Sequence, residues 1–289
     1  MKRPEGRPGV LWLLTAIALC ATTFAPAQSQ GRGRRAQLDD LLPRLAERAA
    51  LYEETALRFA CEEEVTRTDF NKEGAIKKQE SVIHDYLLEY TSRRGLEPYR
   101  AILSRNDTPM RRHKVDPEYG TPHPYGWQLL FVAAGQGRFA FELIDQEFLN
   151  PHDTWVIEFT ALASYTTGDR IEEWEGTVWI DQATLDVLQV RARPSKEIDT
   201  LEARLAEHRQ AFRFMGLSTK KRPRAHFLEV EFDIQREGLR FPSRSLYSVR
   251  LVAGAENMRD DSSIVQRFRD YVFFDVESLD EFKALQAPE

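Results

Sequence analysis

Apolar residues recur at spacings of three and four between residues 38 and 57, and this pattern predicts an amphipathic helix. The apolar stripe consists of Leu38, Leu41, Leu42, Leu45, Ala49, Tyr52 and Ala56, and most charged residues of the segment lie off it. A helix of this kind gains most of its stability by packing on something else. The pattern therefore predicts a helix that covers an apolar surface formed elsewhere in the chain.

Much of the remaining chain alternates between apolar and polar residues, which predicts strands with one apolar face. We expect strands over residues 59–68, 82–90, 99–104, 139–143, 154–160, 171–180, 186–192, 227–234, 246–252 and 264–276. On the last strand, Phe268, Val272 and Phe274 are expected to share one face. The run Glu62-Glu63-Glu64 indicates that the first strand lies near an edge of the sheet, where charge prevents further pairing.

About ten strands with short connections predict an antiparallel meander, because parallel strands would need crossover helices. A sheet of this size must curl, which gives it one concave apolar side. We therefore predict a mainly β, α+β fold, with the helix over the concave side and a helical insertion at 194–222 as a second cover. A long loop spans 105–126, the segment 127–134 is a short helix or strand, and 279–285 is a short terminal helix.

The first 27 residues are typical of a cleavable secretory signal. Lys2, Arg3 and Arg7 precede an apolar run of about 12 residues, shorter than the roughly 20 that a spanning helix needs, and Ala25-Pro26-Ala27 offers a cleavage site. Lipid attachment at Cys20 is disfavoured by the bulky Leu19 before it. We expect a periplasmic or secreted protein without a stable membrane span, with a flexible leader over 28–37 and a single domain over 38–289.

Composition and charge exclude some partners. Removal of residues 1–27 changes the formal net charge from −6 to −8, because the segment carries three basic residues and Glu5. A net acidic chain is a poor candidate for nonspecific binding of nucleic acid. Cys61 is then the remaining cysteine, and its short apolar side chain favours a place in the core.

Candidate chemistry along the chain is sparse. The sequence contains no nucleophile elbow, zinc-protease motif or phosphate-binding loop. His113 and His123 share the long loop with Asp116 and Glu118, but a flexible loop gives no reason for three or four metal ligands to converge. We predict no catalytic residue, no metal site and no cofactor, and therefore a protein that is not an enzyme; a hydrolase built from scattered polar residues is the third alternative.

The segment 174–188, WEGTVWIDQATLDVL, resembles the G-x-[VL]-W-I-D-x-x-T hairpin of periplasmic proteins similar to the outer-membrane lipoprotein-sorting carrier, the LolA-like group. That group shares its fold with the sigma-factor regulator RseB. The resemblance implies an unclosed, strongly curved antiparallel barrel with helices in its mouth. The motif also has a structural interpretation: Ile180 ends a buried strand, Asp181 caps the turn and Thr184 starts the return strand.

Seven large apolar residues are expected on the concave face. They are Phe139, Phe141, Trp155, Ile157, Phe159, Trp174 and Phe232. They could line a ligand pocket or form a plain core, and the sequence leaves both open. The first hypothesis is an envelope protein that binds a lipid or an acylated polypeptide there. The alternative is an RseB-like module that binds an envelope protein through charged loops at 105–126 and 220–224.

Overall fold

The computed structural model describes residues 28–55, 58–91, 95–110, 123–162, 174–195, 223–254 and 257–274. Its helical elements are α1 (Gln28–Thr55), the 3₁₀-helix η1 (Pro124–Phe131) and α2 (Ala133–Gln136). Its strands are β1 (Phe59–Phe70), β2 (Ile76–Thr91), β3 (Gly95–Arg105), β4 (Thr108–Pro109), β5 (Phe139–Leu149), β6 (His152–Ala161), β7 (Trp174–Asp181), β8 (Val187–Pro194), β9 (Arg224–Glu231), β10 (Ile234–Arg236), β11 (Leu239–Phe241), β12 (Arg244–Gly254) and β13 (Asn257–Phe273).

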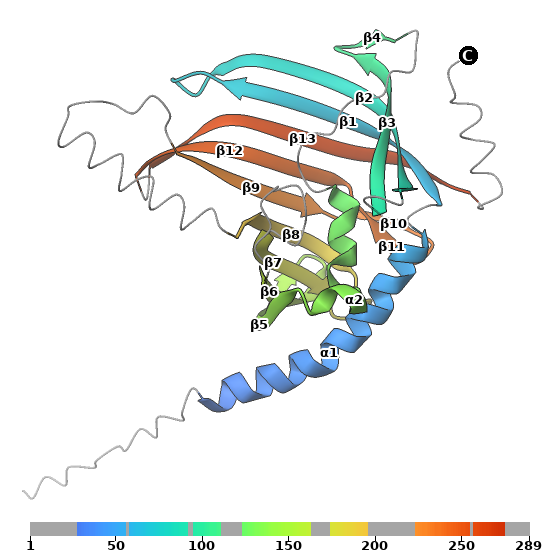
Figure 1. The fold of residues 1–289 in the computed structure, drawn as a ribbon, viewed down its shortest axis with the longest axis vertical. Helices are drawn as coiled ribbons and strands as arrows, with labels where there is room; N and C mark the ends of the chain where they lie inside the picture. The colour runs from blue at the N-terminus through green and yellow to red at the C-terminus, as the bar shows by residue number, and fades with distance from the viewer. Residues whose placement is uncertain are drawn as a thin grey trace, which may run out of the picture.

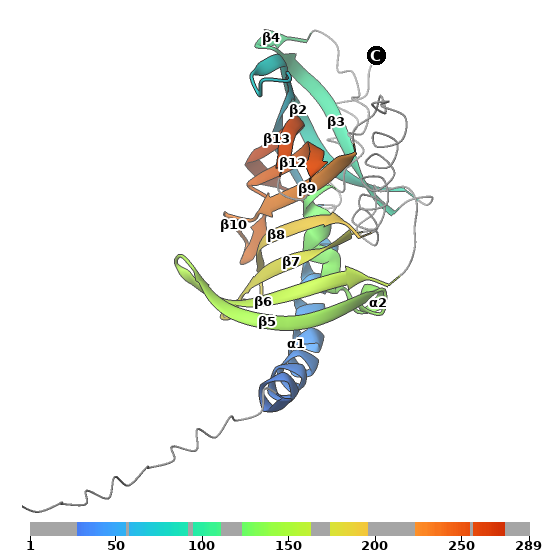
Figure 2. The ribbon, with the colours of Figure 1, turned by 90° about the vertical axis from the view of Figure 1, so that its left-hand side faces the viewer.

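Eleven strands form one antiparallel sheet in the order β4-β3-β2-β1-β13-β12-β9-β8-β7-β6-β5. The sheet does not close on itself, so β4 and β5 are its two edges. It bends strongly between the part formed by β5 to β8 and the part formed by β9, β12, β13 and β1 to β3, and α1 lies across one end (Figures 1 and 2). The predicted fold class, a curved and unclosed antiparallel sheet with an N-terminal helix, is confirmed.

The first strand is not near an edge, as its charges suggested, because β1 pairs with β13 on one side and with β2 on the other. Its acidic residues divide between the two faces of the sheet. Glu62 and Glu64 face outward and lie beside Arg269, whereas Glu63 points inward and is completely buried. Neighbouring residues of a strand point to opposite faces of the sheet, so a run of three acidic residues places some side chains in solvent and one in the interior.

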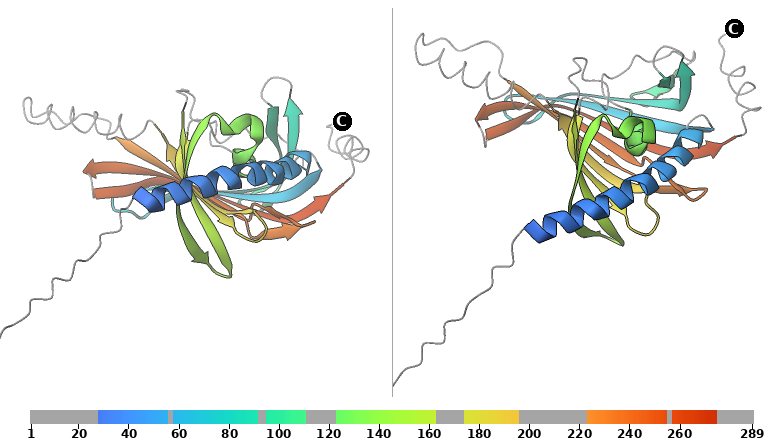
Figure 3. Two further views of the ribbon diagram at one scale, coloured as in Figure 1. Left: turned by 90° about the horizontal axis from the view of Figure 1, so that it is seen from below. Right: turned by 60° about the horizontal axis from the view of Figure 1, so that its bottom comes forward.

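The apolar stripe of the predicted helix is buried, with Leu38, Leu41, Leu45, Ala49 and Tyr52 almost inaccessible to solvent. The helix is longer than its pattern indicated, because α1 begins at Gln28 rather than at Leu38. This first part carries no stripe, and it projects past β5, away from the sheet (Figure 2 and the right panel of Figure 3). The polar segment 28–37 is thus helical, and Arg34 within it donates a hydrogen bond to the Ile144 carbonyl oxygen of β5.

The expected shared face of Phe268, Val272 and Phe274 is wrong for Val272, whose side chain is 61% exposed. The register between β1 and β13 shifts in this region, where Ala60 pairs with Val272 but Glu62 pairs with Arg269. Asp270 takes the left-handed conformation with φ 55°. The extra residue reverses the alternation, so Tyr271 and Phe273 turn inward against Phe59.

The segment 227–234 is divided between two strands rather than forming one. β9 ends at Glu231, and Ile234 belongs to β10, which forms a hairpin with β11. Glu237 and Gly238 at the tip of this hairpin have φ of 50° and 76°. A two-residue type I′ turn requires such positive φ values at both of its central residues. The segment 127–134 contains the end of η1 and the start of α2, with the non-helical Val132 between them.

Several sequence predictions fall outside the described residues. These are the signal at 1–27 and the terminal helix at 279–285. Residues 111–122 of the predicted loop at 105–126, and residues 196–222 of the predicted helical insertion at 194–222, also lie outside. Among the helices that the structure describes, none combines the length and the apolar character needed to cross a bilayer.

Candidate ligand-binding face beneath α1 and η1

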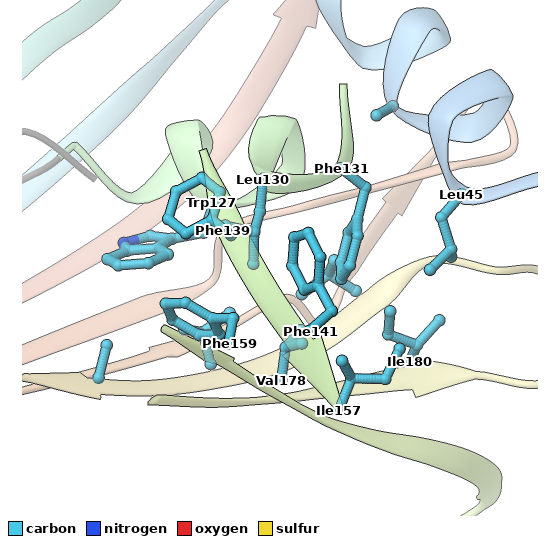
Figure 4. Close-up of a cluster of buried hydrophobic side chains, with 14 of the residues drawn as sticks. Leu45, Trp127, Leu130, Phe131, Phe139, Phe141, Ile157, Phe159, Val178 and Ile180 are labelled. Carbon is cyan, nitrogen blue, oxygen red and sulfur yellow. The ribbon is translucent and has the colours of Figure 1, made fainter. Parts of the chain in front are cut away.

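The seven predicted pocket residues meet on one face of the sheet. Phe139, Phe141, Ile157, Phe159, Trp174 and Phe232 belong to one buried apolar cluster, and Trp155 packs half-buried against it. They come from β5, β6, β7 and the segment after β9, which are brought together by the register of the sheet. Figure 4 shows the side chains of β5 and β6 pointing toward those of η1 and α1. The period-two pattern therefore located this face correctly.

Two helical segments cover this face. α1 contributes Leu38, Leu41 and Leu45 to the cluster, and η1 contributes Trp127, Leu130 and Phe131. The ring of Phe131 stacks on Phe141 with centroids 5.2 Å apart, and Trp127 lies 5.8 Å from Phe159 and 6.1 Å from Trp174. In this conformation, side chains of the protein itself occupy the space between the sheet and its cover.

Short polar contacts fix η1 in place. His123 caps its first turn, because its Nδ1 accepts a hydrogen bond from the Gly126 N–H at 3.1 Å, and Pro124 follows as the first helical residue, where a proline is well tolerated. The buried Gln128 donates to the carbonyl oxygens of Val187 at 3.3 Å and Arg240 at 3.1 Å. These bonds tie η1 to β8 and β11.

A second cluster continues the apolar face at the C-terminal end of α1. It contains Tyr52, Phe59, Cys61, Tyr86, Leu88, Tyr125, Leu239, Phe241 and Phe268. Tyr125 of η1 stacks on Phe241 with centroids 6.0 Å apart and donates a hydrogen bond to the Tyr52 carbonyl oxygen. The cover and the sheet thus share an aromatic contact at this end as well.

One charged junction joins α1 to the sheet. The Arg48 Nη2 lies 2.6 Å from the Asp186 Oδ1, and the Arg48 Nε donates to the same oxygen at 2.7 Å. The Tyr52 hydroxyl also donates to that oxygen at 2.6 Å, and it accepts from the Arg240 N–H at 2.8 Å. Burial, followed by the negative charge of Asp186, raises the pKa of Tyr52 far above its ordinary value. We call Arg48, Tyr52 and Asp186 the helix junction.

A second polar contact lies beside the helix junction. The His152 Nδ1 is 2.7 Å from the Asp181 Oδ2, and the His152 Nε2 is 2.9 Å from the Arg240 Nη2. Arg240 comes from β11, and its backbone already bonds to Tyr52. The turns after β5 and β7 and the β10–β11 hairpin therefore converge on the same end of α1.

Sequence reasoning did not find the helix junction. Arg48 stands three residues after Leu45 and four before Tyr52, so it lies on the buried stripe, and a cation at such a position was the available signal. Asp186 gave no signal of its own, because an aspartate after a turn is ordinary. Its partner is 138 residues away in the chain.

The hairpin that carries the family resemblance has the predicted buried strand and the predicted Asp181 turn, but Thr184 lies in the turn, and the return strand β8 begins only at Val187. The Asp181 Oδ1 accepts from the N–H groups of Ala183 at 2.7 Å and Thr184 at 3.2 Å, which closes the turn between β7 and β8. The glycine of the motif has a separate role: a Cβ at Gly176 would lie 2.0 Å from the Arg191 carbonyl oxygen across the strand pair. Gly176 therefore permits the close approach of β7 and β8.

The described residues contain no group of three or more potential metal ligands, and three residues of the loop cluster, His113, Asp116 and Glu118, lie outside the described part. Burial, followed by the charge of Glu63, raises the pKa of the Cys61 thiol well above its ordinary value. A buried thiol with a raised pKa is poorly suited to act as a nucleophile.

No protein-family model matches this chain, and no curated protein matches it either. Three solved structures are similar to it. A domain described as an outer membrane lipoprotein-sorting protein, from Vibrio parahaemolyticus, has 10% identity and a TM-score of 0.46, with 84% of this chain and 97% of that chain covered. A DUF1329 family protein from Desulfovibrio piger has 12% identity and a TM-score of 0.38, with 85% and 99% covered.

The third structure is the MucA/MucB complex of Pseudomonas aeruginosa, with 11% identity, a TM-score of 0.22, and 80% of this chain and 93% of that chain covered. A lipoprotein-sorting domain and MucB are thus among the solved structures to which this chain is similar, at low identity and with TM-scores below 0.5.

Proposed function

We propose that this chain is an exported, non-enzymatic envelope protein that binds an apolar ligand, a lipid or an acylated polypeptide, on the concave face of its sheet. The observation that carries the proposal is the aromatic face of β5 to β7, which is covered by side chains of α1 and η1. In this proposal, Leu38, Leu41 and Leu45 of α1 occupy the position that the ligand takes when α1 moves away.

The contacts of α1 support this exchange. α1 is attached to the sheet and to its neighbouring helical segments by one apolar stripe, by the helix junction and by several hydrogen bonds. Tyr125 donates to the Tyr52 carbonyl oxygen, and Gln136 donates to the Leu42 carbonyl oxygen. Displacing such a helix exposes apolar side chains on both surfaces, and burial of apolar area contributes about 25 cal/mol per Å². An alkyl chain that buries the same area of sheet offsets the loss of the stripe.

Two measurements on the chain from residue 28 onward test the proposal. Protein purified from the envelope fraction should carry a lipid or an acylated peptide that mass spectrometry detects after solvent extraction. The neutral dye N-phenyl-1-naphthylamine should bind stoichiometrically, and Arg48→Ala should speed its uptake because the helix junction is lost. Arg44→Ala, which changes an exposed arginine of the same helix, is the matched control.

Protein that carries no extractable ligand and does not take up the dye would rule out the proposed function. Dye uptake that is equal in the wild type, Arg48→Ala and Arg44→Ala would leave apolar binding intact but would show that α1 is not the element that moves.

The second candidate is a protein-interaction module of the envelope, and the edge strand β5 favours it. Among the described strands, β5 pairs only with β6, and Phe148 near its end is 67% exposed. An open edge can accept an extended segment of another protein as an additional strand. Cross-linking in cells should then return one defined partner, and Glu142→Pro on β5 should abolish the cross-link while the unfolding transition of the domain remains cooperative.

A further inference from the structure

A belt of buried polar side chains crosses the inner face of five adjacent strands. It runs from Ser245 on β12 through Gln266 on β13, Glu63 on β1 and His84 on β2 to Arg100 on β3. The residues follow one another through the register, because Ser245 pairs with Gln266 and Glu63 pairs with His84. All five are buried. We call them the polar belt.

Glu63 is the centre of the polar belt. The Arg100 Nε and Nη2 donate to its two carboxylate oxygens at 2.5 Å and 3.1 Å, and the Gln266 Nε2 donates at 2.8 Å. The His84 Nδ1 lies 3.4 Å from the Glu63 Oε2. Burial by itself would raise the pKa of the Glu63 carboxyl, but Arg100 and His84 outweigh it and hold that pKa at about 2. Glu63 is therefore ionised, and Arg100 balances its charge.

Stability alone does not account for such a belt. Buried ion pairs are often replaced by apolar side chains with no loss of stability, because removing two charges from water is expensive. In addition, two buried hydroxyl groups, the Ser245 Oγ of the belt and the Tyr86 OH beside it, have no hydrogen-bond partner among the described residues. A buried hydroxyl without a partner is unfavourable and calls for an explanation, such as a bound molecule.

The polar belt borders the apolar face described above. Tyr86 belongs to the second aromatic cluster, where its ring packs 5.5 Å from that of Phe268. The Arg100 guanidinium lies 5.2 Å from the centre of the Tyr86 ring. An elongated molecule on the concave face would therefore pass from aromatic side chains to the belt at Tyr86.

We propose that the polar belt receives the uncharged polar head of an amphiphilic ligand, an ester, amide or alcohol, whose apolar part lies on the aromatic clusters. This inference rests on the proposed function and specifies the class of ligand. Tyr86 and Ser245 carry hydroxyl groups that can both donate and accept a hydrogen bond, so they fit a head with a carbonyl or a hydroxyl group.

The charge balance of the belt selects against an ionised head. The charges of Glu63 and Arg100 cancel, and the Arg100 guanidinium already donates hydrogen bonds to the Glu63 carboxylate. A buried carboxylate or phosphate would add a charge without a counterion, which is strongly unfavourable in a site from which water is excluded. The same site accepts an ester or an amide, because these carry no net charge.

Two probes with the same tail test the inference. 1-Monooleoylglycerol has an uncharged ester and hydroxyl head, whereas oleate at pH 8 has an ionised carboxylate. Binding to the chain from residue 28 onward is measured by equilibrium dialysis, below the concentration at which either probe aggregates. We expect monooleoylglycerol to bind at least tenfold more tightly than oleate.

Variants of the belt should change this preference. Glu63→Gln leaves Arg100 without its counterion, so oleate should gain at least tenfold relative to monooleoylglycerol. Glu62→Gln, which changes the neighbouring outward-facing carboxylate, should leave the preference unchanged. Tyr86→Phe and Ser245→Ala remove hydroxyls without leaving another group unpaired; at least one of them should weaken monooleoylglycerol binding by about three- to tenfold, which corresponds to the loss of one hydrogen bond, and neither should affect oleate.

The outcomes separate the two proposals. If the wild type binds neither probe, the proposed function fails and this inference fails with it. If both probes bind with equal affinity, the proposed function stands and the inference is overturned. It is also overturned if folded Tyr86→Phe and Ser245→Ala proteins, verified by their unfolding transitions, both bind monooleoylglycerol as the wild type does.

Discussion

Arg48 of α1 and Asp186 of the loop before β8 form an ion pair across 2.6 Å, and the carboxylate is completely buried. The pair joins the first element of the fold to the β7–β8 hairpin. Since Asp186 also accepts from Tyr52, one buried oxygen is contacted by two side chains of the same helix. Beside the apolar stripe, the position of α1 on the sheet therefore depends on this one buried carboxylate.

Replacing Arg48 with alanine should destabilise the protein by about 3 kcal/mol, because Asp186 would be left as a buried charge without a cation. Hydrogen exchange should accelerate over residues 33–55 more than over β13. Urea unfolding of the variant measures the first effect, and exchange mass spectrometry the second. Arg44→Ala should leave both unchanged, and equal behaviour of the two variants would contradict a role for the helix junction.

Replacing Gly176 with alanine should cost about 3 kcal/mol or more, since a Cβ there would lie 2.0 Å from the Arg191 carbonyl oxygen and overpacked sites relax only by moving backbone. The free energy of unfolding in urea measures the loss. Gly135→Ala is the matched control, because nothing lies within 4 Å of its Cβ position. A Gly176→Ala protein as stable as the wild type would show that β7 and β8 can separate at no cost.

Replacing Phe159 with alanine should destabilise the folded protein by about 3–5 kcal/mol, as expected for removing a buried aromatic ring. Phe148→Ala should change stability by less than about 0.5 kcal/mol, because that ring is largely exposed and surface changes are usually small. Thermal unfolding of both variants tests this. If the two variants lost equal stability, the face beneath α1 would not be packed as described.

Stability should fall in two steps as the pH is lowered. His123 has its pKa lowered to about 4, first by burial and then by the positive charge of Arg100. The unfolded chain takes up a proton near pH 6.5 while the folded protein does not, so stability is full above pH 6.5 and declines toward pH 4. The pKa difference corresponds to about 3 kcal/mol. His123→Gln should remove this first step in urea unfolding measured from pH 8 to pH 3.

The second step belongs to Glu63, whose pKa is lowered to about 2 in the folded protein. Its contribution is present above pH 4.5, where the unfolded carboxyl is ionised as well, and is lost as the pH falls toward 2. Glu63→Gln should flatten the decline below pH 4.5 and leave the first step in place. A pH profile that is unchanged by either substitution would contradict the roles given to these two residues.

The sequence predicted those features that repeat along the chain. The stripe from Leu38 to Tyr52 identified the buried face of α1, and the alternation around Phe141 and Phe159 identified the concave face, because both follow from periodic burial. The turn at Asp181 was also predictable, since an aspartate side chain can close a turn through its own neighbours.

Features set by single residues or by distant pairing were not predictable in this way. The bulge at Asp270 changes which residues of β13 face inward, and no feature of the composition signals it. Val272 is exposed as a result. Glu63 could not be distinguished from Glu62 and Glu64 until the position of β1 inside the sheet was known. Arg48 and Asp186 are separated by 138 residues, so no local pattern could mark them as partners.

The strand order has a consequence for the synthesis of this protein. β13, the last described strand, separates β1 to β4 from β5 to β9 and β12. Until residues 257–273 leave the ribosome, the chain can form only two disconnected sheets, each with an open edge. The two parts are therefore joined into one sheet only through the pairing of β13 with β1 on one side and with β12 on the other.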